Sequence, residues 1–104
     1  MHIHYISEQN SILNHFLAQI RDVNIQNDSM RFRKNIERIG EIMAYELSKT
    51  LDYKEIDVQT PFGIKHTTTI AEPVVLCSIL RAGLALHQGF MSFFDNAENG
   101  FVSA

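Results

Sequence analysis

The chain has 104 residues, 45% of them hydrophobic, with nine Lys and Arg against twelve Asp and Glu and a net charge of −3. This length supports one modest hydrophobic core, so the chain forms one domain or part of one. Neither sign of charge is gathered into a block, which excludes an electrostatic patch for nucleic acid or for a membrane surface.

The cysteine content and the N-terminus indicate a cellular compartment. Cys77 is the only cysteine, so neither an intramolecular disulfide nor a thiol zinc site can form within the chain. The first residues, Met1 to Tyr5, lack the basic start and apolar core of a signal peptide, and no stretch approaches the ~20 apolar residues of a membrane helix. We therefore expect a cytoplasmic protein with no metal site of its own and no membrane partner.

Two amphipathic helices are predicted in the first half of the chain. Apolar residues recur at helical spacing from Ser7 to Asp22. The polar run Asn27-Asp28-Ser29 offers side-chain oxygens that can cap a second helix, which the apolar spacing extends over about Met30 to Leu51. Arg33 lies on a charged face of this second helix, where a structural ion pair or a subunit contact accounts for it as well as substrate binding would, and the structural interpretation is favoured.

A β-hairpin and a buried strand are predicted next. The segments Ile56–Thr60 and Ile64–Ile70 are rich in β-branched residues, and Pro61-Phe62-Gly63 between them supplies turn chemistry. The almost unbroken apolar run Val74–Leu80 is typical of a central parallel strand covered on both faces. Cys77, inside that run, is therefore expected to be a buried, small apolar residue.

A third helix and the beginning of another strand complete the chain. Helical spacing of apolar residues runs from Leu84 to Phe94, and the pairs Asp95-Asn96 and Asn99-Gly100 predict a loop. Phe101-Val102 is interpreted as a second strand that has only started when the chain reaches Ala104. We therefore expect the 104 residues to end inside a strand of an incomplete fold.

The passage from the buried strand to the third helix is the segment suited to chemistry. Backbone amides of Ala82, Gly83 and Leu84 are expected to point outward at the positive end of the helix, where an anion binds well. Arg81 adds a fork-shaped donor that matches paired phosphate oxygens, and Gly83 lacks the β-carbon that would hinder a ligand. The spacing alone leaves open a solvated or carboxylate-paired Arg81.

Four stretches together resemble the uracil phosphoribosyltransferase family. Ile79–Leu84 is similar to the pyrophosphate-contacting loop of these enzymes. Three others agree with the family in order and spacing: His15–Asp22 with the end of the first helix, Met43–Glu46 with the second helix, and Asp57–Pro61 with the start of the β-hairpin hood. The chain resembles the N-terminal half of such an enzyme.

The resemblance implies an incomplete phosphoribosyltransferase-type α/β fold. It has two N-terminal helices, a β-hairpin hood and the start of a parallel sheet. Residues 1–104 would be the N-terminal part of one domain: a helical arm over 1–54, the hairpin over 55–71, and over 72–104 the first strand, loop and helix with the start of the next strand. In relatives the loop often includes a non-proline cis peptide.

The resemblance also implies an activity in pyrimidine salvage. Phosphoribosyl pyrophosphate, with magnesium on its pyrophosphate, would react with uracil to give UMP and pyrophosphate. Arg81 would be the catalytic residue that stabilises the departing charge, and Arg81, Ala82 and Gly83 would bind substrate. A homodimer without nucleic acid is the implied assembly.

Some family features fall outside the 104 residues. These are a second phosphate-binding Arg just after the strand that starts at Phe101, an acidic pair followed by Thr-Gly-Gly, and a C-terminal segment that recognises uracil. The chain alone is therefore expected to be inactive.

Alternative functions remain open. One is a non-catalytic dimerisation or interaction remnant of the same fold, and the residues beyond Ala104 would separate it from the enzyme. Others are a phosphoribosyltransferase of different base preference, or a regulatory relative that binds pyrimidine nucleotides and RNA. The absence of a basic face argues against the RNA-binding alternative.

Overall fold

The computed structural model describes residues 3–103, so Met1, His2 and Ala104, at the ends of the predicted domain, lie outside the described residues. The elements in chain order are η1 (Ile6–Glu8), α1 (Ile12–Arg21), α2 (Ser29–Ser48), β1 (Tyr53–Thr60), β2 (Gly63–Ile70), β3 (Val75–Leu80), α3 (Leu84–Phe93) and β4 (Glu98–Ser103). The order of helices, hairpin, strand, helix and strand agrees with the sequence prediction.

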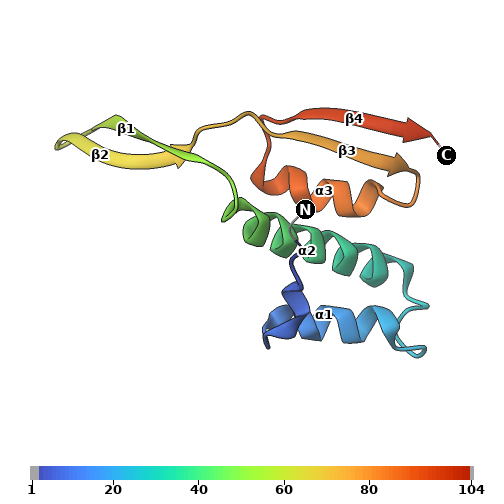
Figure 1. The fold of residues 1–104 in the computed structure, drawn as a ribbon. Helices are drawn as coiled ribbons and strands as arrows, with labels where there is room; N and C mark the ends of the chain where they lie inside the picture. Colours follow the sequence, from blue (N-terminus) through green and yellow to red (C-terminus); the bar gives the residue numbers. More distant parts are fainter. Residues whose placement is uncertain (1–2, 104) are drawn as a thin grey trace.

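The elements are arranged in layers, with one arm extending from them. Helix α2 lies between α1 and α3, and α3 lies between α2 and the sheet formed by β3 and β4 (Figure 1). The β1–β2 hairpin projects away from these layers, which gives the chain its long dimension in an envelope of 54 × 33 × 33 Å. No helix among residues 3–103 is long and apolar enough to cross a membrane.

Capping residues set the starts of the first two helices. Ser11 Oγ accepts a hydrogen bond from the Leu13 amide at 3.2 Å, so α1 begins later than the predicted Ser7. Asp28 Oδ1 accepts from the Arg31 amide at 3.1 Å, as expected of a cap in the polar run before α2. Short side-chain acceptors thus decide where each helix starts.

A buried polar contact joins α1 to α2. Asn35 is completely buried, its Nδ2 donates to Gln19 Oε1 at 2.7 Å, and its Oδ1 accepts from the Arg38 guanidinium at 3.1 Å. The Arg38 guanidinium also lies 5.4 Å from the centre of the Phe16 ring. Because a buried amide without partners is costly, this contact favours one way of packing the two helices.

Helices α2 and α3 touch through their backbones. A β-carbon added to Gly89 would lie 2.1 Å from the carbonyl oxygen of Glu37, and one added to Gly40 would lie 2.6 Å from that of Leu86. These distances are far below van der Waals contact, so each position requires glycine. The crossing holds α3, and therefore the loop that precedes it, in a fixed place beside α2.

The hairpin is confirmed and is longer than predicted. Its antiparallel register runs from Tyr53 opposite Ile70 to Thr60 opposite Gly63. Gly63 has a φ of +130°, a conformation that favours glycine, and the tip side chain of Phe62 is fully exposed. This turn could be predicted from the sequence because turn preferences depend on the residues of the turn itself.

The last strand corrects one sequence expectation. β4 pairs in parallel with β3 from Val75 opposite Glu98 to Leu80 opposite Ser103, so Asn99-Gly100 lies inside a strand and not in a loop. The side chain of Asn99 is accommodated there because its Oδ1 lies 2.8 Å from Nε2 of His87 on α3. A tertiary hydrogen bond thus overrides a local turn signal.

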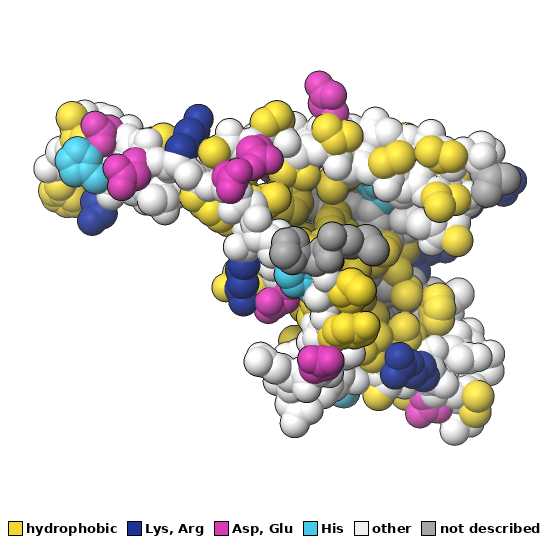
Figure 2. Space-filling model, viewed as in Figure 1, with side chains coloured by type: hydrophobic (Ala, Val, Ile, Leu, Met, Phe, Trp, Pro, Cys, Tyr) yellow, Lys and Arg dark blue, Asp and Glu magenta, His cyan; other side chains and the backbone are white. Residues whose placement is uncertain are grey.

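The expectation that β3 is covered on both faces is wrong for the described residues. Leu76 is buried against α3, whereas Val75 and Ile79 on the other face are 64% and 62% exposed, and Cys77 beside them is also exposed. The described helices all lie on one side of the sheet (Figure 1). Figure 2 accordingly shows hydrophobic side chains at the surface along this sheet.

Candidate functional site

The loop from Arg81 to Gly83 follows β3 and leads into α3. It lies at the end of the molecule where the chain passes from α1 to α2, at the right of Figure 1. The Leu80–Arg81 peptide bond is cis, as the family resemblance implies for this loop. The Arg81 side chain is exposed at the carboxyl end of a parallel strand, where open α/β sheets bind their ligands.

The backbone amides that are free at the start of α3 differ from those expected. The Gly83 amide donates to Ile79 O at 3.0 Å, and the Leu84 amide donates to Arg81 O at 3.1 Å. Within residues 3–103, the amides of Ala82, Ala85 and Leu86 have no backbone acceptor. The helix start therefore retains unpaired donors, but only Ala82 among them was named from the sequence.

Gly83 has a different purpose from the one expected. A β-carbon here would lie 2.8 Å from Ile79 O and 3.2 Å from the β-carbon of Ser78. Its φ of −77° is open to any residue, so conformational freedom is not the reason for glycine. Gly83 allows the loop to pack against β3, and the missing side chain faces the protein rather than a ligand.

A buried hydroxyl lies close to this packing contact. Ser78 Oγ is buried and has no hydrogen-bond partner within the described residues. An unpaired buried hydroxyl carries a desolvation cost, of order 1–3 kcal/mol in proteins.

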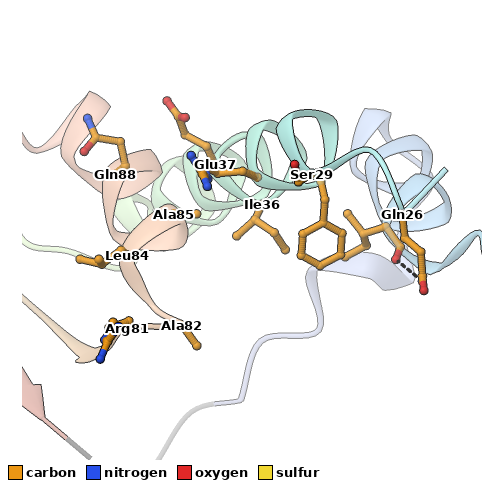
Figure 3. A pocket seen from close by; sticks show the side chains of 12 residues that line it. Gln26, Ser29, Ile36, Glu37, Arg81, Ala82, Leu84, Ala85 and Gln88 are labelled. Atoms are coloured by element: carbon orange, nitrogen blue, oxygen red, sulfur yellow. Dashed lines mark hydrogen bonds between the residues drawn. The ribbon is translucent and has the colours of Figure 1, made fainter.

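A hollow of about 1040 Å³ opens between the loop and α2. Its lining residues come from α1 and the segment after it, from α2, and from the loop with the first turns of α3: Ile20, Gln26, Ser29, Phe32, Arg33, Ile36, Glu37, Arg81, Ala82, Leu84, Ala85 and Gln88. Figure 3 shows Arg81 and Ala82 on one side of this space, with Ile36 and Glu37 of α2 across from them. The size is at the upper limit of small-molecule sites, which is about 1,000 Å³.

The structure places two of the three predicted site residues on this hollow. Arg81 and Ala82 line it, and Gly83 does not. Arg33 lines it as well, although the sequence interpretation favoured a structural ion pair or a subunit contact over substrate binding for this residue. Among residues 3–103 Arg33 makes no ion pair, so within the described residues only the subunit contact and substrate binding remain.

The donor set of the hollow does not suit a metal cage. No group of three His, Cys, Asp or Glu residues is placed to hold a metal within residues 3–103. Glu37 is the one carboxylate on the lining, and its Oε1 lies 3.7 Å from Nζ of Lys34. Magnesium at phosphate sites is usually held by one or two carboxylates together with the oxygens of the phosphate groups, and Glu37 is the single carboxylate that the lining offers.

Comparison with solved structures identifies the fold. The structure of AQ2163 protein from Aquifex aeolicus matches with a TM-score of 0.77 and 27% identity, covering 92% of this chain and 46% of that chain. An α/β fold of the phosphoribosyltransferase type, present in part, is therefore the class to which the helices, hairpin and parallel strands belong.

Sequence comparison identifies the family. The family model described as uracil phosphoribosyltransferase matches residues 6–104. Proteins named uracil phosphoribosyltransferase from Porphyromonas gingivalis and Sulfolobus acidocaldarius are 49% identical over 104 residues and 41% identical over 96 residues. The chain belongs to the uracil phosphoribosyltransferase family. It spans about half the length of these relatives, covering 48% and 44% of them.

Proposed function

We propose that this chain is the pyrophosphate-binding half of an enzyme that transfers a phosphoribosyl group from phosphoribosyl pyrophosphate to uracil. The products are UMP and pyrophosphate. The observation that carries the proposal is the exposed Arg81, held between β3 and α3 at the edge of a hollow, in a chain that belongs to this family. Arg81 is the proposed catalytic residue.

The chemistry needs a stabilised leaving group more than a reactive side chain. As the bond from the anomeric carbon to pyrophosphate breaks, negative charge collects on the departing oxygens. The Arg81 guanidinium can donate two parallel hydrogen bonds to such oxygens, and the unpaired amide of Ala82 can add a third. Gly83 supports this arrangement by letting the loop lie close to β3.

The remaining parts of the proposal concern the metal ion, the oligomeric state, the cellular location and the activity of the chain alone. Magnesium is proposed from the family resemblance, bound to the pyrophosphate of the substrate. A homodimer and a cytoplasmic location are proposed from the family resemblance, and a single cysteine fits a reducing compartment. The chain alone is proposed to be inactive, because the base-recognising part of the family's enzymes has no counterpart in it.

A chimeric enzyme tests the catalytic proposal. Residues 1–104 would be joined to the remaining part of the Porphyromonas gingivalis relative, whose matching half is 49% identical to this chain. We expect the chimera to form UMP from uracil and phosphoribosyl pyrophosphate, as measured with labelled uracil. The substitution Arg81→Ala should lower kcat about 100-fold or more, the cost typical of removing one charge-stabilising donor.

The controls separate the enzyme from its alternatives. The intact relative is the positive control, and circular dichroism checks that each chimera is folded. A folded chimera without UMP formation would favour the non-catalytic remnant. Activity that survives Arg81→Ala at full rate would show that the loop has no catalytic part.

A further inference from the structure

The basic residues of α2 differ in whether they have a partner. Three have partners within the described residues: Arg31 lies 3.9 Å from Asp28 Oδ2, Lys34 lies 3.7 Å from Glu37 Oε1, and Arg38 donates to Asn35 Oδ1 at 3.1 Å. Arg33 has neither an ion pair nor a side-chain hydrogen bond within residues 3–103. It is also the one that shares the hollow with Arg81.

The hollow carries an excess of positive charge. Arg33 and Arg81 both line it, and Arg81 likewise has no acidic partner within the part of the chain that is described. Glu37, the only acidic lining residue, lies near the ammonium of Lys34. Two arginines and a single carboxylate on one lining favour an anion with several oxygens, which can accept hydrogen bonds from both guanidinium groups.

Backbone packing holds the two arginines on facing walls. Arg33 is in the second turn of α2, and Arg81 is directly before α3. Two turns further along α2, Gly40 brings that helix into direct contact with α3 at Leu86 O. Because the crossing leaves no room for either helix to slide inward, the start of α2 keeps a fixed position relative to the loop.

We propose that Arg33 is a further substrate-binding residue, which contacts the diphosphate group of phosphoribosyl pyrophosphate from the wall opposite Arg81. The proposal rests on the proposed function and deepens it. Arg33 is distinct from the second phosphate-binding arginine implied by the family resemblance, which would follow β4. Its guanidinium binds phosphate oxygens on the face that Arg81 does not reach, so the two arginines enclose the anion.

The test is a set of binding measurements on the 104-residue chain. Isothermal titration would use inorganic pyrophosphate, phosphoribosyl pyrophosphate and ATP as separate probes. Arg33→Ala and Arg81→Ala should each raise the Kd for the first two probes about tenfold or more, the loss expected for a hydrogen-bonded charge pair. Arg33→Lys should weaken binding less than Arg33→Ala does, because lysine keeps the positive charge and lacks only the paired donors of the guanidinium group.

Arg31→Ala is the matched control. This arginine lies two residues away on the same helix, is exposed, and does not line the hollow. It should leave the Kd unchanged, which excludes a general effect of net charge. Circular dichroism melting should give the same midpoint for the Arg33 variants as for the parent chain, since Arg33 has no partner to lose.

Each other outcome has a definite meaning. If Arg81→Ala weakens pyrophosphate binding and Arg33→Ala does not, the inference about Arg33 is wrong and the proposed function stands. If neither substitution changes the Kd, or no probe binds, both fail. If Arg33→Ala weakens only ATP binding, Arg33 serves a nucleotide other than the substrate, and the proposal is overturned.

Discussion

The β1–β2 hairpin and the crossing of α2 with α3 are held together in opposite ways. The hairpin is a two-stranded ribbon that extends from the body, and both of its strands are mostly exposed (Figure 1). At the crossing, the backbones of Gly40 and Gly89 touch the neighbouring helix with no side chain between them. Tolerance to substitution should therefore differ sharply between the two regions, and the loop that carries Arg81 depends on the intolerant one.

The largest effect is expected at the crossing. Gly89→Ala would place a β-carbon 2.1 Å from Glu37 O and 2.9 Å from the backbone nitrogen of Glu41, and neither atom can move without shifting α2. Overpacking of a tight core costs typically 1–3 kcal/mol and occasionally more, and a backbone clash of this depth belongs at the upper end. Urea unfolding measures the loss.

Gly100→Ala is the matched control for that experiment. A β-carbon at Gly100 would meet Cys77 Sγ at 3.6 Å, which is ordinary contact. It should change the free energy of unfolding by much less than Gly89→Ala does. Equal losses at the two glycines would mean that helix contact at Gly89 is not what holds the crossing.

The contrast also explains what the sequence could predict. Periodic apolar residues in α1 and α2, the cap at Asp28 and the turn before Gly63 are local signals, and each was confirmed. The strand position of Asn99 was missed because it depends on His87, which is twelve residues earlier in the chain. Local turn chemistry carries no information about such a partner.

The candidate site was predictable only in part for the same reason. Arg81 and Ala82 could be read from the order of strand, loop and helix. The placement of Arg33 on the same hollow could not be predicted, because Arg33 precedes Arg81 by nearly fifty residues and reaches the hollow only through the packing of α2 on α3. The reason for glycine at position 83 was likewise hidden, since Ile79 O limits the space there through a fold-dependent contact.

A small electrostatic effect is expected where the hairpin joins the body. The Asp52 side chain, through a hydrogen bond and its like charge, raises the pKa of the exposed Glu72 above 4.5. The folded state therefore holds this proton more tightly than the unfolded chain does. Its contribution to stability is fully present below about pH 4.5 and is lost as the pH rises through the raised pKa.

Asp52→Asn tests this direction of the change in stability with pH. At pH 7 the substitution removes a repulsion and should raise the melting temperature slightly, and at pH 3.5 the gain over the parent chain should vanish. Glu55→Gln, which removes one exposed negative charge from the same hairpin, is the control and should show no such pH-dependent gain. A gain of equal size at both pH values would contradict the like-charge explanation.

The smallest effect is expected at the tip of the hairpin. Phe62 is fully exposed, so Phe62→Ser removes no burial within the chain and should change the free energy of unfolding by less than about 0.5 kcal/mol. Ile39→Val, at a residue only 8% exposed in the core, should cost about 0.5–1.5 kcal/mol under the same conditions. Size-exclusion chromatography of both variants adds the oligomeric state, which unfolding measurements do not report. A shift to smaller species with Phe62→Ser, at unchanged stability of the isolated chain, would mean that the exposed ring packs against a second copy, because only an intermolecular contact could depend on a side chain that touches nothing in its own chain.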